Sequence, residues 1–197
     1  MHAQLVLSIA AGVVLFCSPG VNAQQMSVDL DPAGTTIEFT LGATMHTVHG
    51  AFKLKSGHIV FDSKSGSASG SVIVDATSAD TGNASRDKKM HAEILQSRKF
   101  PEIVFTPTRE KGEIAGQGTS LAEVSGIFRL CGQDHPATLS MTVEPRSGSV
   151  NVSTQFAVPY IQWGLKNPST FLLHVSDTVN LQIHAMAAMS PLSTRSN

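Results

Sequence analysis

Residues 81–105, TGNASRDKKMHAEILQSRKFPEIVF, form the one segment that departs from an otherwise regular alternation of apolar and polar residues. Seven charged side chains lie in this segment before Pro101, whereas the rest of the chain is sparsely charged. The run then passes directly into the apolar stretch 102–105. A chain that reads as β-strands almost throughout is therefore predicted to be interrupted once, by a different element.

The spacing within residues 86–96 predicts a short amphipathic helix. Met90, Ile94 and Leu95 fall on one side of such a helix, and charged side chains occupy the other side. Asn83 offers an N-cap just before it. We expect a helix of about three turns that presents its apolar side to a β core as a lid or plug.

The remainder of the chain predicts antiparallel strands with one buried face and one wet face. Apolar residues recur at every second position in short runs, and clusters of Gly, Ser, Asp and Pro separate these runs. The runs are 28–30, 37–41, 59–61, 72–74, 124–130, 139–143, 150–152, 173–175 and 179–183. Many short strands at this spacing favour a β-sandwich or a β-barrel.

Residues 1–23 have the layout of a secretory signal peptide, with an apolar run at 5–16 and small or β-branched residues before Ala23. The run is about twelve residues long, which is too short to span a bilayer. We therefore expect export to the periplasm or secretion. Two alternatives stay open, an uncleaved anchor and a lipoprotein modified at Cys17, although Phe16 is not the small residue that normally precedes a lipidated cysteine.

Cleavage after Ala23 would leave a chain of the right length for one domain. We assign residues 24–188 to this domain and residues 189–197 to a polar tail, and we expect no transmembrane span in the mature chain. Cys131 is then the only cysteine, and we predict that it is a small buried hydrophobe that reacts slowly with thiol reagents. The formal net charge of −1 gives no electrostatic reason to expect nucleic acid or an anionic membrane surface as the main partner.

An ordered series of motifs resembles the YceI family across roughly residues 27–185. The motifs are HTVHGAF at 46–52, Gly57 with Phe61-Asp62, TGN at 81–83 with Arg86-Asp87 and Met90, FPEIVF at 100–105, VSGIFRL at 124–130 with Gly132 and PATL at 136–139, and Trp163-Gly164 with DTV at 177–179. The most specific piece is the Arg-Asp pair that precedes the FPEIVF strand.

This resemblance implies an all-β, lipocalin-like antiparallel barrel of about eight strands, with the helix at its side or mouth. It also implies a long apolar cavity that binds a polyisoprenoid or isoprenoid-quinone-like lipid, and a periplasmic or secreted protein that sequesters or carries this lipid. The candidate ligand-binding residues are Phe39, His46, Phe52, Phe61, Arg86, Met90, Ile94, Phe105, Met141, Trp163 and Phe171. Each apolar member also fits an ordinary core position, and Arg86 with Asp87 also fits a role in fastening the helix to the barrel.

Two rival functions remain open at this stage. One is a lipid-modifying enzyme that uses His46 or His49 as a base, and the other is a barrel with a filled core that acts through its surface. Residues three apart in a strand face opposite sides, and no Asp, Glu or Cys completes a ligand set around the two histidines, so we expect no metal and no cofactor. No catalytic motif stands out, and we assign no catalytic residue. A homodimer also remains open.

Overall fold

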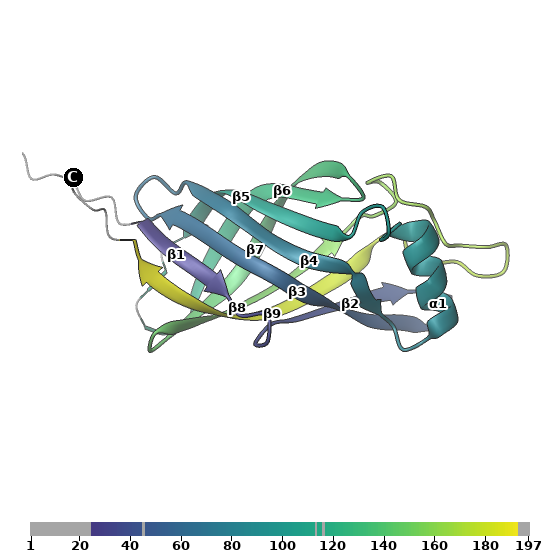
Figure 1. Ribbon diagram of the computed structural model, residues 1–197, viewed down its shortest axis with the longest axis horizontal. Helices are drawn as coiled ribbons and strands as arrows, with labels where there is room; N and C mark the ends of the chain where they lie inside the picture. Colours follow the sequence, from purple (N-terminus) through teal and green to yellow (C-terminus); the bar gives the residue numbers. More distant parts are fainter. Residues whose placement is uncertain (1–24, 45, 113, 116, 193–197) are drawn as a thin grey trace, which may run out of the picture.

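The computed structural model describes residues 25–44, 46–112, 114–115 and 117–192, and its strands close into one antiparallel barrel. The elements are β1 Gln25–Leu30, β2 Thr36–Gly42, β3 Thr47–Asp62, β4 Ala68–Asp80, α1 Ala84–Lys89, the π-helix η1 Met90–Ile94, β5 Glu102–Gly112, β6 Ser120–Leu130, β7 Gln133–Arg146, β8 Ser149–Val158 and β9 Val179–Pro191. The start of β1 and the end of β9 lie at one end of the barrel, and α1 lies at the other (Figure 1).

The nine strands of the described residues fill eight positions around the barrel. The hydrogen-bonded order is β3-β2-β9-β8-β7-β6-β5-β4, and pairing of β4 with β3 closes the ring. Both β1 and β2 pair with β3 on one side and with β9 on the other. They pair with different parts of β3, since Val28 of β1 lies opposite Ile59 and Ile37 of β2 lies opposite Phe52. The two strands are successive halves of one position, separated by residues 31–35. The predicted barrel of about eight strands is therefore confirmed.

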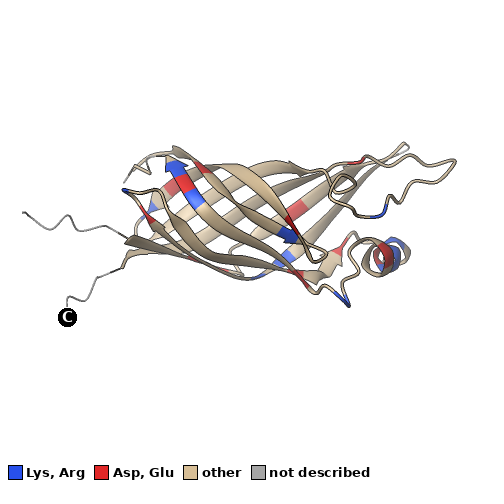
Figure 2. Ribbon diagram, turned by 90° about the horizontal axis from the view of Figure 1, so that it is seen from above, with Lys and Arg blue, Asp and Glu red and all other residues tan. Residues whose placement is uncertain are grey.

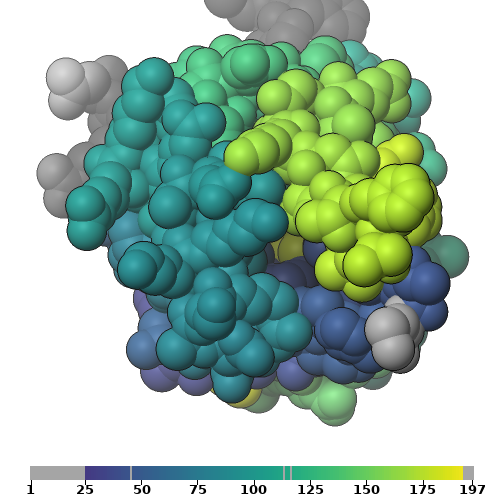
Figure 3. All heavy atoms as spheres, turned by 90° about the vertical axis from the view of Figure 1, so that its right-hand side faces the viewer, coloured from purple at the N-terminus to yellow at the C-terminus, as the bar shows by residue number. Residues whose placement is uncertain are grey.

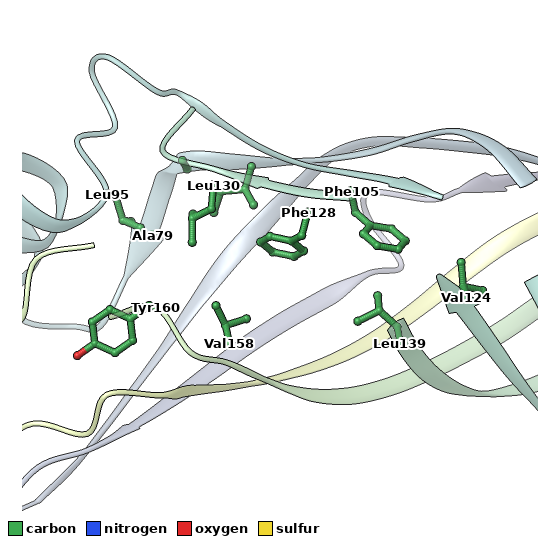
Figure 4. Packing of buried hydrophobic residues seen from close by; sticks show 11 residues of the cluster. Ala79, Leu95, Phe105, Val124, Phe128, Leu130, Leu139, Val158 and Tyr160 are labelled. Carbon is green, nitrogen blue, oxygen red and sulfur yellow. The ribbon is translucent and has the colours of Figure 1, made fainter. Parts of the chain in front are cut away.

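Strict alternation along the strands builds the interior. In β6, every second residue from Ser120 to Leu130 is buried, whereas Leu121 and Glu123 between them are exposed. Side chains from strands far apart in the sequence meet inside, as Phe105, Phe128, Leu139 and Val158 do in Figure 4. The alternation of apolar and polar residues, from which the strands are predicted, thus corresponds to the inside and outside of the barrel.

The predicted strand at 173–175 is wrong. Only an isolated bridge between Ala43 and Val175 forms there, within the long connection 159–178. Thr170 and Leu173 exchange hydrogen bonds that make a local turn: Thr170 N donates to Leu173 O, and Leu173 N donates to Thr170 Oγ1. The apolar alternation arises because Leu173 and Val175 both face an internal cavity, not because the backbone belongs to the sheet.

The last strand runs further than the sequence predicted. Residues 189–191, part of the predicted polar tail, belong to β9, and Pro191 lies opposite Met26 of β1. The barrel therefore extends to residue 191. The predicted signal peptide, residues 1–23, and residues 193–197 lie outside the described part of the chain.

The predicted helix is present, but it consists of two kinds of turn. Asn83 caps α1, since its side chain accepts a hydrogen bond of 3.0 Å from Arg86 N. The chain then widens into η1, where Leu95 N donates to Met90 O at 2.9 Å. Gln96 adopts a positive φ of 47° and ends the helical segment, so the helix predicted over 86–96 spans 84–94.

Candidate ligand-binding site

Two adjoining cavities occupy the barrel. The outer cavity, of about 540 Å³, lies at the end that carries α1, and the inner cavity, of about 190 Å³, extends toward the end where β1 begins and β9 ends. Both are lined by Phe52, Ile103, Phe128 and Leu181, which we call the waist. Cavities of a few hundred Å³ are typical of sites for small molecules. The two cavities therefore adjoin within the barrel, and the waist lies where they meet.

The inner cavity is almost entirely apolar. Its lining consists of aliphatic, aromatic and methionine side chains, nearly all of them from the strands, with Thr154 and Glu110 as the two polar exceptions. A water molecule needs two to four polar partners to be held in a buried space. The inner cavity is therefore suited to an apolar chain.

Glu110 enters this apolar lining because of a β-bulge in β5. The register of β5 against β6 shifts between Pro107 and Arg109, so Thr108 and Arg109 are both exposed and Glu110 turns inward. Its Oε1 atom is buried and has no hydrogen-bond partner among the described residues. Burial raises the pKa of the Glu110 carboxyl above its ordinary value.

The outer cavity changes from apolar to polar toward its mouth. Its polar lining residues are His46, Thr81, Asn83, Ser85, Arg86 and Lys89. The lining residues that it shares with the inner cavity, which are those of the waist, are all apolar. Seen from this end, the surface is hollowed between the teal helical segment and the yellow-green connection between β8 and β9 (Figure 3). This gradient suits an amphiphile with its head at the mouth and its tail inside.

Arg86 and Asp87 fasten the start of the helix to the end of β4 through Thr81. Arg86 Nε donates to Thr81 Oγ1 at 2.7 Å, and Arg86 Nη2 donates to Thr81 O at 3.0 Å. Asp87 Oδ1 accepts hydrogen bonds from Thr81 N and Thr81 Oγ1. These contacts use two of the five N–H donors of the guanidinium, and Arg86 also lines the cavity. The fastening role and a role at the mouth are therefore compatible.

Further contacts hold the helical segment over the barrel. His91 Nε2 donates to Ala79 O at 2.9 Å, and Cys131 Sγ donates to Leu95 O at 3.2 Å. Lys166, in the connection between β8 and β9, forms an ion pair with Glu93. These three contacts keep the apolar side of the segment against the cavity. Burial also raises the pKa of the Cys131 thiol.

Tyr160 closes one side of the outer cavity. It is buried, and its hydroxyl donates to Ser176 O at 2.7 Å. Burial, together with the negative charge of Asp177, raises the pKa of Tyr160 to about 12. The phenol stays neutral at physiological pH, so it serves as a hydrogen-bonded wall and not as a base.

The structure brings nine of the eleven candidate residues to the cavities. Phe39, His46, Phe52, Arg86, Met90 and Ile94 line the outer cavity, and Phe52, Phe61, Phe105 and Met141 line the inner one. Trp163 and Phe171 line neither. The Trp163 ring stacks on His135 with the ring centroids 4.3 Å apart and packs against Phe128 with the centroids 5.4 Å apart, whereas Phe171 is fully exposed in a loop. Ligand contact by the nine stays a prediction.

Several lining residues were not singled out from the sequence. Leu41, Val48, Phe128, Leu130, Val158, Tyr160, Leu173, Val179 and Leu181 all line the outer cavity. Most of them have the same alternation as the candidates that we chose. The signal was therefore present in the strand pattern, but it does not separate cavity lining from filled core.

The two histidines of the HTVH motif lie on different sides of the barrel wall. His46 lines the outer cavity, whereas His49 lies with Glu38 and Gln182 in a surface groove. Within the described ranges, no group of three or more His, Cys, Asp or Glu side chains is placed to hold a metal ion. In the same part of the chain, no helix has the length and apolar character needed to cross a membrane.

A closed antiparallel barrel with an elongated apolar cavity, open beside a short helix, belongs to the ligand-enclosing class of β-barrels. Residues 29–187 match the model of the YceI-like domain, and the chain belongs to this family. It is 31% identical over 136 residues to the protein YceI of Salmonella newport, which covers 68% of this chain and 69% of that protein.

Two solved structures have the same fold. Burkholderia cenocepacia BcnA aligns with a TM-score of 0.67 and 17% identity, over 81% of this chain and all of that one. A polyisoprenoid-binding domain from Saccharophagus degradans aligns with a TM-score of 0.64 and 17% identity, over 83% of this chain and 98% of that one.

Proposed function

We propose that this protein is an exported carrier of a polyisoprenoid or isoprenoid-quinone-like lipid. The observation that carries the proposal is the continuous apolar lining of two cavities in line, which becomes polar at the mouth. The likeness to a domain described as polyisoprenoid-binding supports the ligand class. Export, to the periplasm or beyond, rests on the signal-peptide pattern of residues 1–23.

The shape of the cavities favours a slender chain over a compact apolar molecule. A ligand that uses both cavities must pass the waist, where Phe52 and Phe128 reach into the space from different strands. Each five-carbon isoprene unit that is buried supplies a gross gain of several kcal/mol, at about 0.8 kcal/mol per methylene-sized group, before ordering costs. Affinity therefore rises with chain length until the cavities are full.

The residues at the mouth favour a head group that is anionic or accepts hydrogen bonds. Arg86 and Lys89 are cationic donors on the helical segment, and His46 lies on the lining of the same cavity. Phosphate and carbonyl oxygens accept strong hydrogen bonds from such groups. Thr81 holds the Arg86 guanidinium in place, so the donor is already positioned before a ligand arrives.

Carriage is favoured over catalysis by the separation of the two histidines. His46 lines the cavity mouth, but His49 lies in the outer groove, so the two cannot act on one substrate. Among the described residues, the His46 ring has no hydrogen-bonded side-chain partner, and a general base usually needs such a partner to orient it.

Native mass spectrometry of the protein purified from its host without detergent tests this function. We expect a co-purifying apolar mass, and we expect added polyprenyl phosphates to bind more tightly as the chain lengthens. A protein that carries no added mass and takes up none would contradict the proposal and favour a filled barrel. Chemical conversion of the added lipid would favour the enzyme.

A further inference from the structure

The mouth end of the barrel carries the two most exposed large apolar side chains of the described residues. Phe171 is 102% exposed and Leu172 is 86% exposed. They are adjacent, in the loop 166–173, which we call the mouth loop and which projects beyond the barrel beside α1 (Figure 1). Exposed apolar side chains that stand together mark interaction sites more often than single ones do.

The same end also carries a concentration of positive charge. Residues 86–99, which we call the basic segment, contain five Lys and Arg side chains and two acidic ones, although the whole chain has a formal net charge of −1. Lys88, Lys89, Arg98 and Lys99 are exposed. Blue ribbon on α1 shows part of this charge in Figure 2. The near-neutral total therefore hides an uneven distribution.

The two acidic side chains of the basic segment are already engaged within the protein. Asp87 accepts hydrogen bonds from Thr81, and Glu93 is paired with Lys166 of the mouth loop. The ion pair also joins the mouth loop to the basic segment. Both flank the opening, because Lys89 and Leu173 line the same outer cavity. A flat surface that meets this end contacts the basic segment and the apolar tip together.

We infer that the mouth end is a docking surface for an anionic lipid bilayer. Phe171 and Leu172 insert into the interface between head groups and acyl chains, while the exposed Lys and Arg side chains of the basic segment lie against anionic head groups. A soft bilayer interface needs no complementary groove around the loop, in contrast to a protein partner. This inference rests on the proposed function and adds a partner to it: a docked mouth lets an apolar chain enter the cavity without crossing water.

Vesicle flotation with the mature chain tests the docking surface. We expect binding to vesicles of phosphatidylglycerol mixed with phosphatidylcholine, much weaker binding to pure phosphatidylcholine, and a decrease with added salt. Phe171→Ser with Leu172→Ser should reduce binding by more than about tenfold, because both side chains lose their apolar burial. Lys88→Ala with Arg98→Ala should also reduce it by more than about tenfold, at roughly fivefold per charge.

Matched controls lie elsewhere on the barrel. Leu121→Ser removes a side chain that is 77% exposed on the wall of β6, and Lys64→Ala with Lys111→Ala removes two exposed charges near the opposite end. These variants should bind vesicles as the wild type does. Equal binding by the Phe171 and Leu172 variant, or no vesicle binding by the wild type, would overturn the inference. So would a loop variant that changes only the oligomeric state, since Phe171 would then belong to a contact between copies.

Uptake of a short soluble isoprenoid separates this inference from the proposed function. Farnesol binding can be followed by the fluorescence of Trp163, which touches Phe128 of the waist and is the only tryptophan. The Phe171 and Leu172 variant should keep its farnesol affinity while losing vesicle binding, which would support docking. A wild-type protein that binds anionic vesicles through the loop but takes up no isoprenoid would support docking and contradict the carrier.

Discussion

Cys131 shows how one side chain can serve both a turn and a lid. It adopts a positive φ of 50° between β6 and β7, and its thiol donates to the carbonyl groups of Ile94 and Leu95, where η1 ends. The sequence predicts a buried cysteine, whereas Cys131 is only half-buried in the structure. Its environment is nevertheless apolar, because Cys131 packs against the main core cluster.

We therefore predict that Cys131 reacts many-fold more slowly with a thiol reagent in the native protein than in the unfolded chain. Burial raises the pKa of the thiol, so less of the reactive thiolate is present at neutral pH. Labelling followed by mass spectrometry, with and without urea, measures the two rates. Equal rates would mean that the helical segment opens freely, and the contact with Leu95 O would then contribute little.

Glu110 gives a second prediction, about pH. Its pKa is raised by burial in the folded protein, so between the ordinary carboxyl value of 4.5 and the raised value the folded state holds a proton that the unfolded state has lost. Its contribution to stability is therefore fully present below the ordinary value and is lost as pH rises through the raised value. We expect the free energy of unfolding of the wild type to fall, relative to Glu110→Gln, as pH increases through this window.

Urea unfolding of both proteins, at acidic and at neutral pH, measures this difference. Glu144→Gln is a matched control, because Glu144 lies on a barrel strand with its carboxylate paired to Arg146. Parallel pH profiles for the wild type and Glu110→Gln would show that the carboxyl reaches water in solution.

At this scale the sequence predicts which face a side chain occupies, but not where the face changes. Alternation correctly placed Phe39, Phe61 and Phe105 inside. It could not reveal the bulge that turns Glu110 inward, because a bulge depends on the pairing of β5 with β6. Alternation also could not separate Phe171 from the lining residues, because it predicts the inner or outer side only for residues within a strand, and Phe171 lies in a loop.

Among the elements, the helical segment connects fold and function most directly. Its caps and amphipathic spacing are local properties, and they predicted its position within two residues at each end. The π-helical turns were not predictable in the same way. They depend on partners remote in the chain, such as Cys131 of the β6–β7 turn and Lys166 of the mouth loop. Such turns are frequent at functional sites.

The double substitution Met90→Asp with Ile94→Asp should abolish lipid uptake. Both side chains line the outer cavity, and an unpaired carboxylate in an apolar space costs several kcal/mol, far more than the lost methylene contacts. Native mass spectrometry with an added polyprenyl phosphate measures uptake. Circular dichroism and melting curves allow the comparison to be made at a matched folded fraction.

Ala84→Asp with Ala92→Asp is the control for this pair. Both alanines are exposed on the same helical segment, so the variant gains the same charge on the wet side. We expect it to take up lipid as the wild type does. If the folded Met90 and Ile94 variant still binds lipid normally, the helical segment is not part of the site.

For the molecule as a whole, the sequence left open whether the barrel is filled or hollow. Eight strands set a diameter at which either outcome is possible. The answer depends on the sizes of side chains that meet from different strands, and small residues are frequent among them. Ala122, Ala185 and Ala187 all line the inner cavity, opposite larger side chains. Their small size leaves the space beyond the waist unfilled, and no local pattern in the sequence records that summed volume.

The tandem arrangement of cavities predicts that the inner one sets the maximum chain length. Ala185→Leu with Ala187→Leu adds methylene groups to its wall, so the tail of a long polyprenyl chain should no longer fit. We expect affinity for the longest chains to fall by at least about tenfold, with affinity for short chains unchanged, because a short chain ends before the waist. Filling an apolar void should change the free energy of unfolding by no more than about 1–2 kcal/mol in either direction.

Ala157→Leu, on the exposed side of β8, adds the same groups outside the barrel and should leave the length profile unchanged. Native mass spectrometry against a ladder of polyprenyl phosphates, with urea unfolding of each variant, measures both effects. If the filled variant still prefers the longest chains, the tail does not pass the waist. The ligand would then lie folded in the outer cavity, and the inner cavity would be a packing defect of the barrel with no share in binding.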